Sequence, residues 1–294
     1  MVPLFIQQGH TMPHWQTSRT RIDLARPQVM GIVNITPDSF SDGGRHGSTR
    51  EALLHCETLI RDGADILDLG AESTRPGAQP LSQEHELQRL LPVLRHAVTL
   101  GVPVSVDTYK PAVMQAALDA GADIVNDVWA LRWSDAANGL SAAAVIARHP
   151  HCGVCLMHMH GNPLTMQVAP MQGRIVEAVR DFLRDAAQAL VAQGVDKARI
   201  CIDPGIGFGK TVEQNFSLLA QQSHLVDTGF AVLAGWSRKS SLGAVTGAAT
   251  DDRVVASAVA AALAVQNGAH IVRVHDVRET VQALRVVAAV QAAA

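Results

Sequence analysis

Three polar side chains, each at the end of a short apolar run, are the residues of this sequence best placed to bind a ligand. They are Asp107, Asn126 and Asp203. Burying a carboxylate at such a position without hydrogen-bond donors is costly, so we expect the ligand to supply N–H groups. A flat heterocycle with an amino-pyrimidinone edge offers paired N–H donors to an aspartate and acceptors to Asn126 and Lys239. These residue types therefore indicate a site for an amine-rich ring.

Two later motifs carry positive charge at the ends of apolar runs. Ser237-Arg238-Lys239-Ser240 places two cations beside hydroxyls and backbone N–H groups where a helix should begin, which favours an anionic ligand. In Arg273-Val274-His275, strand alternation puts the arginine and the histidine on one face. Such a charge cluster is more often a solvated turn, but the loops after strands seven and eight of α/β barrels commonly hold phosphate. Together the two motifs predict a local phosphate site.

The glycine-rich stretch from Asp203 to Thr211 matches only half of a nucleotide-binding loop. Pro204 stands where the P-loop pattern requires glycine, and the glycine spacing differs from the dinucleotide fingerprint. We interpret the stretch as a turn that lets a ligand approach the backbone beside Asp203. A tight turn beside a solvated aspartate is the alternative.

Cys152 and Cys155, with four histidines nearby, invite the hypothesis of a zinc site. Within an extended strand these two side chains point to opposite faces, so they cannot share one tetrahedral ion. We therefore predict buried, reduced core cysteines, and the same for Cys56 and Cys201.

The elements that must position these residues are eight short apolar runs separated by segments of helical periodicity. Continuous apolar runs are typical of parallel strands covered on both faces. Eight such units predict a single (β/α)8 barrel, an α/β fold whose chemistry sits at the carboxyl ends of the strands. The runs are Val29 to Asn34, Ala64 to Glu72, Val102 to Thr108, Ala122 to Asp127, Gly153 to His158, Arg199 to Asp203, Phe230 to Ser237 and Ala269 to His275.

Composition excludes several classes of protein. Hydrophobic residues make up 48% of the 294 residues and charged residues 17%, which suits one large core. The formal net charge is −3, and no block of like charge offers a surface for nucleic acid. No apolar run approaches the roughly 18 residues that span a bilayer, and no secretion signal begins the chain. We expect a cytoplasmic protein without membrane or nucleic-acid partners.

Secondary features along the chain add expectations about its ends, loops and helices. Residues 1–20 lack periodicity and are expected to form a flexible extension before the 21–294 barrel domain, with a short strand over Arg21 to Leu24 capping the barrel's bottom. Glycines at 63, 121 and 268 should each end a helix before a strand. Capping boxes at Ser48 and Thr211 predict two helix starts. The long loops 34–47 and 73–82 suggest mobile covers over the site.

At these same residues the chain resembles dihydropteroate synthases, enzymes of folate biosynthesis. The likeness extends from about Arg21 to Leu284. It rests on seven motifs in order, namely Met30 to Gly44, Ala71 to Gly77, Ser105 to Thr108, Asn126 to Val128, Asp203 to Lys210, Ser237 to Ser240 and Arg273 to Asp276. The resemblance implies a transferase that condenses 6-hydroxymethyl-7,8-dihydropterin diphosphate with para-aminobenzoate, giving 7,8-dihydropteroate and pyrophosphate.

The resemblance also implies roles for individual residues. Those expected to bind the pterin diphosphate are Asp107, Asn126, Val128, Met157, Asp203, Phe208, Gly235, Lys239, Arg273 and His275, with Arg273 stacked on the ring. Arg75, Arg273 and His275 should contact phosphate oxygens. Asn34 should ligate Mg²⁺, the expected cofactor, with Asp42 joining when its loop closes. The expected residues around para-aminobenzoate and the reaction centre are Phe40, Asp42, Thr74, Arg75, Pro76, Phe208, Lys239 and Ser240.

By the same resemblance, pyrophosphate should leave first, and the cation left at the exocyclic methylene should be stabilised by Asp107 and Asp203. A Schiff base on Lys239 is an alternative, although no carbonyl substrate is implied. Two further alternatives are a catalytically silent pterin-binding paralogue and a pterin-dependent methyltransferase domain, but the loop motifs of the synthases are all present.

The chain departs from the family pattern at two positions, and the resemblance also bears on its oligomeric state. Trp236 is bulkier than expected, and His160 stands where glutamine is common, which affects pocket shape and the response to sulfonamides, the drugs that target this family. The family commonly forms homodimers through barrel helices, and the segments Val254 to Val265 and Val281 to Ala294, rich in alanine and valine, would permit one here.

Overall fold

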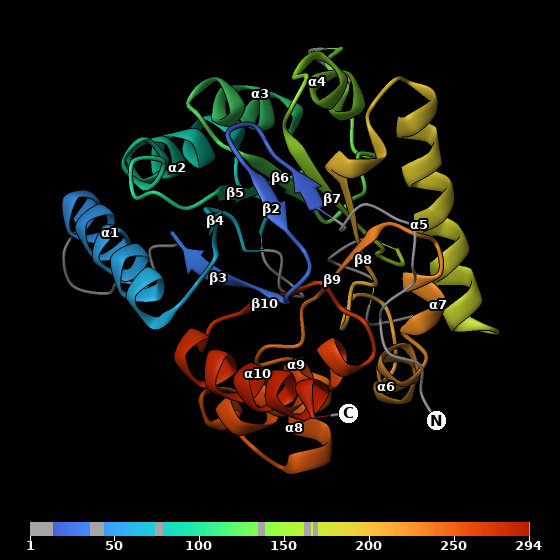
Figure 1. The fold of residues 1–294 in the computed structure, drawn as a ribbon. Helices are drawn as coiled ribbons and strands as arrows, with labels where there is room; N and C mark the ends of the chain where they lie inside the picture. Colours follow the sequence, from blue (N-terminus) through green and yellow to red (C-terminus); the bar gives the residue numbers. More distant parts are fainter. Residues whose placement is uncertain are drawn as a thin grey trace.

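A computed structural model describes residues 14–35, 44–73, 79–134, 139–161, 166 and 170–293 of the chain. Eight parallel strands close into a barrel in the order β10-β3-β4-β5-β6-β7-β8-β9 (Figure 1). The strands are β3 (Gln28–Asn34), β4 (Ile66–Gly70), β5 (Val104–Asp107), β6 (Ile124–Asp127), β7 (Gly153–Met157), β8 (Ile200–Asp203), β9 (Ala231–Ala234) and β10 (Ile271–Val274). Seven of the eight apolar runs contain one of these strands, and the first run matches β3 except for Gln28, so the predicted barrel is confirmed.

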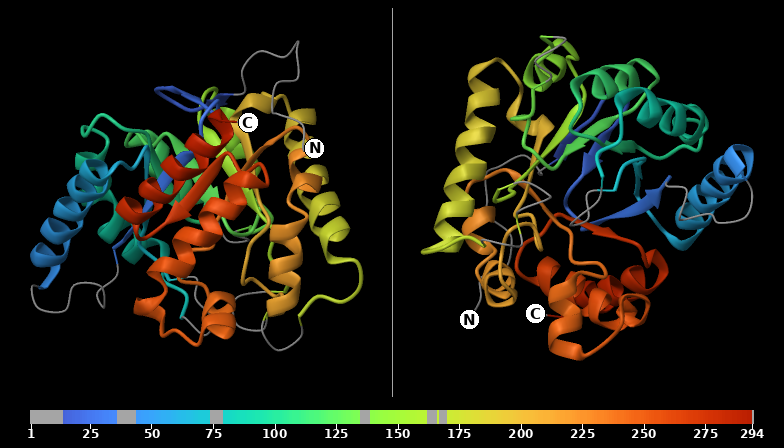
Figure 2. Two further views of the ribbon diagram at one scale, coloured as in Figure 1. Left: turned by 60° about the horizontal axis from the view of Figure 1, so that its bottom comes forward. Right: turned by 180° about the vertical axis from the view of Figure 1, so that it is seen from behind.

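Helices surround the barrel and cover its outer face (Figure 2). They are α1 (Gly44–Asp62), α2 (Gln83–Ala97), α3 (Pro111–Asp119), α4 (Ala142–Arg148), α5 (Ile175–Ala192), α6 (Val212–Ala220), α7 (Ser223–Val226), α8 (Ser240–Thr246), α9 (Val254–Gln266) and α10 (Val277–Ala292). Two short 3-10 turns, η2 (Lys197–Arg199) and η3 (Thr250–Asp252), complete the described elements. None of the described helices is long and apolar enough to cross a membrane.

Strand alternation divides the core into two layers. In β6, Ile124 belongs to the cluster inside the barrel, whereas Val125 belongs to the larger cluster between barrel and helices. The cysteines obey the same rule, since Cys155 lies inside the barrel and Cys152 lies in the outer layer. All four cysteines are buried thiols. The prediction of core cysteines is confirmed, since Cys152, just before β7, and Cys155 within it are buried in different layers.

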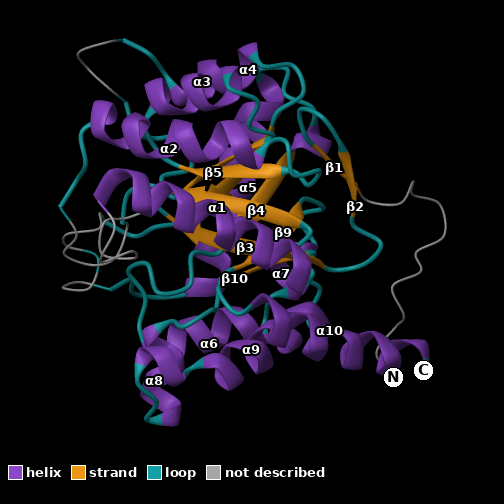
Figure 3. Cartoon of the chain, turned by 90° about the vertical axis from the view of Figure 1, so that its left-hand side faces the viewer, coloured by secondary structure: helices purple, strands orange, loops and turns teal. Residues whose placement is uncertain are grey.

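A small antiparallel hairpin, β1 (His14–Gln16) and β2 (Arg21–Asp23), covers one end of the barrel (Figure 3). The short strand expected at Arg21 to Leu24 is present as β2, although it ends at Asp23. Trp15 is fully buried and donates from Nε1 to the Arg199 carbonyl over 2.9 Å. The expectation of a flexible extension is therefore wrong for residues 14–20, because that segment pairs with β2 and places a tryptophan in the core. Residues 1–13 lie outside the described part of the chain.

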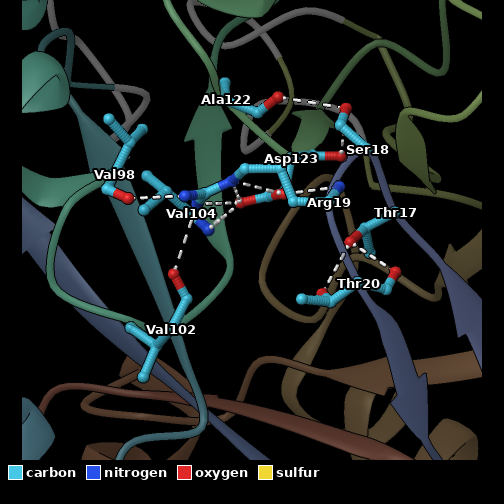
Figure 4. Close-up of polar contacts among 9 residues, drawn as sticks. All are labelled: Thr17, Ser18, Arg19, Thr20, Val98, Val102, Val104, Ala122 and Asp123. Atoms are coloured by element: carbon cyan, nitrogen blue, oxygen red, sulfur yellow. Dashed lines mark hydrogen bonds and ion pairs between the residues drawn. The ribbon is translucent and has the colours of Figure 1, made fainter.

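Polar contacts fix this hairpin to the bottom of the barrel (Figure 4). Asp123, fully buried just before β6, accepts from the backbone N–H of Arg19 over 3.1 Å and from Val104 N over 2.8 Å. The guanidinium of Arg19 donates to the same carboxylate from Nε and Nη2. One carboxylate thus ties the N-terminal segment to the starts of β5 and β6.

Local helix signals were accurate at some ends and wrong at one. Thr211 and Gln214 form the predicted capping box of α6. Gly63, Gly121 and Gly268 have φ of +105°, +100° and +93°, as the repeat before each strand predicts. The predicted start at Ser48 is wrong, since α1 begins at Gly44. No proline interrupts residues 44–48, so the helix extends past a favourable cap.

Candidate active site

Parallel register brings the predicted polar tips to one rim of the barrel. Asn34 pairs with Gly70, Gly70 with Asp107, and Asp107 with Asn126, while Met157 pairs with Asp203. Paired residues on neighbouring parallel strands point to the same face, and here that face is the interior. The side chains at the ends of these described strands therefore share one rim of the barrel, which we call the opening.

Arg273 joins two carboxylates inside this opening. Its Nη2 lies 2.8 Å from Asp107 Oδ2, and its Nε lies 2.6 Å from Asp68 Oδ2. Burial opposes the charge of Arg273, but the two carboxylates raise its pKa above the ordinary value. The guanidinium is consequently charged and held on its Nε and Nη2 edges, which leaves its flat face and Nη1 for a ligand.

Asp68 was missed by the motif search, although the sequence carries a signal for it. It is the charged residue in the middle of the apolar run of β4, and alternation places it on the face of Ile66 and Gly70. The residue is fully buried and accepts from Asn126 Nδ2 over 3.3 Å. A carboxylate in a strand buried on both faces is unusual enough to single out.

Burial raises the pKa values of Asp107 and Asp203, the two aspartates expected to bind the ligand. Desolvation raises the pKa of Asp107 to about 7 despite Arg273, and the charges of Asp68, Glu86 and Asp127 add to the rise. Burial also raises the pKa of Asp203, against a hydrogen bond from Gly205 N of 2.7 Å and the positive charge of Lys239. Such shifts are common where a binding site removes charge from water.

The glycine-rich turn after β8 packs closely against the end of β7. Gly205, Gly207 and Gly209 all have positive φ, and a Cβ on Gly205 would overlap the His158 carbonyl oxygen. Lys210 is buried beneath the turn and donates from Nζ to the carbonyls of Gly205, Phe208 and His158. The lysine therefore stabilises the turn from within and is not available to bind phosphate as the lysine of a P-loop does.

Apolar side chains form one wall of the opening. Val128, Met157 and Phe208 were expected there, and they share a buried cluster with Met159 and Met166. Lys239 Nζ lies 4.4 Å from the centre of the Phe208 ring, a cation–π contact that joins the loop after β9 to this wall. Gly235 lies beside Asp203, since an added Cβ would stand 3.8 Å from its Oδ2.

His158 is a core histidine and not part of this wall. Burial first, and then the charge of Lys210, lower its pKa to about 2, so its ring is neutral. The ring packs edge-on against Phe182 of α5 at 5.0 Å between centres. The expectation that Met157, and not His158, faces the ligand fits this arrangement.

Two side-chain contacts join the loop after β9 to the loop after β10, and they involve two adjacent residues of each loop. Ser237 Oγ lies 2.9 Å from His275 Nδ1, and Arg238 Nη2 lies 2.6 Å from Asp276 Oδ1. The idea that both cations of the Ser237–Ser240 motif face an anion is wrong for Arg238, because Asp276 and Asp251 take its guanidinium. Ser240 is exposed at the start of α8.

The structure also shows where Trp236 and His160 lie, the two residues that depart from the family pattern. Trp236 is buried outside the barrel, with its ring 5.2 Å from that of Phe216 in α6, so its bulk does not enter the opening. His160 is exposed beside the glycine-rich turn.

Five expected site residues lie outside the described part of the chain, namely Phe40, Asp42, Thr74, Arg75 and Pro76. Within that part, no group of three histidine, cysteine, aspartate or glutamate side chains is arranged as a metal site.

Comparisons with known proteins place the chain in one family of enzymes. Residues 30–275 match the family model described as pterin binding enzyme. A dihydropteroate synthase of Neisseria meningitidis serogroup B is 46% identical over 278 residues, covering 92% of this chain and 95% of the relative. The structure of Xanthomonas albilineans dihydropteroate synthase with 4-aminobenzoic acid superposes with a TM-score of 0.88 at 46% identity, covering 96% of this chain and 99% of that one. Burkholderia cenocepacia dihydropteroate synthase complexed with 7,8-dihydropteroate gives a TM-score of 0.85 at 47% identity, covering 96% and 97%.

Proposed function

The chain belongs to the dihydropteroate synthase family of pterin-binding enzymes, and from this premise we propose how its residues carry out the reaction. It is a transferase that condenses 6-hydroxymethyl-7,8-dihydropterin diphosphate with para-aminobenzoate to give 7,8-dihydropteroate and pyrophosphate in folate biosynthesis. The observation that supports the assignment of residues is the shared rim of Asp107, Asn126 and Asp203 around Arg273.

The pterin is held by hydrogen bonds that match its edge. Asp107 and Asp203, as carboxylates, accept from ring and amino N–H groups, while Lys239 donates to a ring acceptor. The Arg273 guanidinium, held at its edge by two carboxylates, presents its flat face for stacking on the ring. Val128, Met157 and Phe208 enclose the apolar faces of the pterin, and Gly235 leaves room beside Asp203.

The diphosphate would be held beside the tip of β3, where the residues present could also hold Mg²⁺. The donor at hand is the Asn34 side chain at the tip of β3, whose oxygen is a ligand type that Mg²⁺ accepts, and Asp42 supplies a carboxylate. Mg²⁺ held by these residues would neutralise charge on the departing pyrophosphate. Phosphate oxygens are bound by His275, by Arg75 and by the Nη1 side of Arg273. The contact of Ser237 Oγ with Nδ1 fixes the His275 ring.

Departure of pyrophosphate leaves a cation on the exocyclic methylene, delocalised into the dihydropterin ring. The carboxylates of Asp107 and Asp203 stabilise that charge. The aryl amine of para-aminobenzoate then attacks the methylene, so no side chain acts as a covalent nucleophile. Phe40, Thr74, Pro76, Lys239 and Ser240 shape the pocket for this second substrate, and Ser240 faces its carboxylate. Sulfonamides, as analogues of para-aminobenzoate, compete at that pocket.

Two copies of the chain associate through the face formed by α9 and α10. These helices pack side by side (Figure 2). Exposed apolar residues recur on them at helical spacing, at Val255, Val259 and Leu263 of α9 and at Val286 and Val290 of α10. An apolar patch of this kind on a soluble enzyme is typical of an interface, and a second copy supplies the matching patch. The buried thiols suit a cytoplasmic enzyme.

A coupled assay of pyrophosphate release tests the function directly. We expect sustained turnover, with one pyrophosphate released for each dihydropteroate formed, only when pterin diphosphate, para-aminobenzoate and Mg²⁺ are all present. Turnover that does not depend on Mg²⁺ would remove the ion from the proposal. Isothermal calorimetry of an Asp203→Asn variant addresses the pterin site, since unchanged affinity for the pterin diphosphate would contradict its placement.

A further inference from the structure

A buried carboxylate lies beneath the proposed pterin site and is not one of its expected ligands. Asp68 occupies the middle of β4, one interior position below Gly70 of the rim, and is fully buried. The strand register pairs it with Ser105 of β5. Because both faces of the strand are covered, water cannot solvate this carboxylate, and its charge must be balanced by protein groups.

Asp68 holds the arginine of the site from below. Its Oδ2 lies 2.6 Å from Arg273 Nε, a charge-assisted hydrogen bond. The same guanidinium reaches Asp107 through Nη2 over 2.8 Å. The carboxylates of Asp68 and Asp107, on neighbouring strands, thus bind Nε and Nη2 of Arg273, which fixes both the position and the plane of the guanidinium.

Asp68 also decides which way the Asn126 side chain faces. Asn126 Nδ2 lies 3.3 Å from Asp68 Oδ2. The reverse orientation would set the amide oxygen against a carboxylate oxygen, two acceptors without a proton between them. The amide oxygen of Asn126 is consequently turned away from Asp68, and its orientation is set before any ligand arrives.

The carboxylate is costly in this position. Its second oxygen, Oδ1, is buried with no hydrogen-bond partner among the described residues. The Arg273 cluster also contains two carboxylates for one guanidinium, so the balance within it is negative. A buried group that is only partly satisfied lowers stability, and such groups are typical of functional sites.

We propose that Asp68 is a positioning residue for pterin binding, which acts through Arg273 and Asn126 without touching the substrate. The inference rests on the proposed roles of those two residues. Asp68 holds the guanidinium plane across the floor of the opening and presents the Asn126 amide in one orientation. Both groups are then ordered in the free enzyme, so the ligand does not bear the cost of ordering them.

The test compares graded variants by calorimetry with 6-hydroxymethyl-7,8-dihydropterin diphosphate and Mg²⁺. Asp68→Asn keeps an oxygen that can accept from both Arg273 and Asn126 but removes the charge, whereas Asp68→Ala removes the contact. We expect Asp68→Ala to raise the Kd about 10- to 100-fold and Asp68→Asn by less than about tenfold. The KM for para-aminobenzoate should stay within about twofold of the parent in both variants.

Ser105→Ala is the matched control. Ser105 lies beside Asp68 in the register, and its buried hydroxyl also has no partner among the described residues. Its removal should change pterin affinity by less than about twofold. Thermal unfolding without ligand shows whether each variant is folded, and Asp68→Asn decides the matter if Asp68→Ala is not.

Asn126→Ala separates failure of this inference from failure of the site itself. If Asn126→Ala loses pterin affinity while both Asp68 variants bind as the parent does, Asp68 is not a positioning residue and the pterin site stands. If Asn126→Ala also binds normally, the site assignment fails and the inference with it. In the Asp68→Ala, Asn126→Ala double variant, the losses should combine to less than their product, because one residue acts partly through the other. If the two losses of affinity multiplied fully in the double variant, Asp68 would not act through Asn126.

Discussion

Arg238 adopts left-handed backbone geometry, with φ of +58°, and its guanidinium makes two hydrogen bonds to the carboxylate of Asp276. Nη2 lies 2.6 Å from Asp276 Oδ1, and Nε lies 3.1 Å from Oδ2. The contact joins the loop after β9 to the loop after β10. Lys239 follows Arg238, and His275 precedes Asp276, so this ion pair lies between two residues proposed to bind substrate. A non-glycine residue held at positive φ is typical of sites where the surroundings impose the conformation.

Loss of this pair should reduce catalysis. We expect Asp276→Asn and Arg238→Ala each to lower kcat/KM for the pterin diphosphate about tenfold, because Lys239 and His275 lose the contact that fixes their loops. Arg238→Gly should unfold at a higher temperature than Arg238→Ala, since glycine adopts positive φ without strain. Steady-state kinetics and thermal unfolding of the three variants measure both effects.

Asp251 supplies the control for this prediction. It contacts Arg238 Nη1 at 3.5 Å but is almost fully exposed, so Asp251→Asn should leave kcat/KM within about twofold of the parent. An Asp276→Asn variant with the kinetics of the parent would show that the ion pair does not position the loops.

A buried charge cluster at the start of the loop after β4 should matter for stability. Lys110 Nζ contacts Glu72 Oε2 and lies 2.6 Å from Glu86 Oε2, and all three side chains are nearly inaccessible to solvent. Lys110→Met would leave two carboxylates buried without their cation, so we expect a loss of roughly 3 to 5 kcal/mol in the free energy of unfolding. Urea denaturation measures it.

The exposed Lys197 gives a matched lysine-to-methionine control. It lies over the Phe230 ring at 4.9 Å, far from the rim, and Lys197→Met should cost less than about 1 kcal/mol. Equal losses in the two variants would mean that the buried cluster contributes no more than a surface contact. Glu72 also accepts from Leu81 N over 3.2 Å, so the cluster holds together both ends of the loop that contains Thr74, Arg75 and Pro76.

The rim of the site was predictable because a parallel barrel gathers the ends of its strands. Asp107, Asn126 and Asp203 could be found from the polar residue that ends each apolar run. The ion pair of Lys110 and Glu86 could not be predicted, since it joins positions 24 residues apart and depends on how α2 packs beside α3. Arg238 was misjudged for a similar reason. Its positive φ turns the side chain toward Asp276, and nothing in the motif itself indicates that conformation.

The first strand of the N-terminal hairpin was missed because its signal is a single tryptophan. Three-residue strands are too short to show alternation, and Trp15 becomes informative only when the bottom of the barrel receives it. We expect Asp123→Ala to lower the free energy of unfolding by about 2 to 3 kcal/mol, since Val104 N and Arg19 lose their shared acceptor. KM for both substrates should stay unchanged, because Asp123 lies at the opposite end of the barrel from the rim.

Arg19→Ala should have a smaller effect than Asp123→Ala. The arginine is partly exposed, so its removal leaves an acceptor that still receives the Val104 and residue-19 N–H groups. A drop in kcat for either variant at a temperature where both are folded would argue that the hairpin affects the active site.

The proposed dimer can be tested at its most exposed apolar positions. Val255 of α9 is 75% exposed and Val286 of α10 is 65% exposed. A Val255→Glu, Val286→Glu double variant would place two charges in the interface, so we expect it to sediment as a monomer where the parent is a dimer. Leu54→Glu on α1, 52% exposed, is the control and should not change the sedimentation coefficient. A monomeric parent at micromolar concentration would exclude the proposed interface.

Pterin binding should weaken as pH falls, because the carboxylate of Asp107 must be ionised to accept N–H groups. Burial, together with the charges of Asp68, Glu86 and Asp127, raises its pKa to about 7 against the opposing charge of Arg273. Below that pH the protonated carboxyl loses acceptor capacity. The Kd for 6-hydroxymethyl-7,8-dihydropterin, a probe without titrating phosphates, should therefore rise about tenfold for each pH unit below 7.

Asp107→Asn identifies the residue responsible for this pH dependence. The amide cannot ionise, so the variant should bind more weakly than the parent at pH 8 and show a much flatter profile, with Asp203 as the remaining titrating contact. Asp68→Asn should shift the profile of the parent toward lower pH, because one of the charges that raises the Asp107 pKa is removed. A parent profile that stays flat down to pH 5 would mean that Arg273 keeps Asp107 ionised throughout.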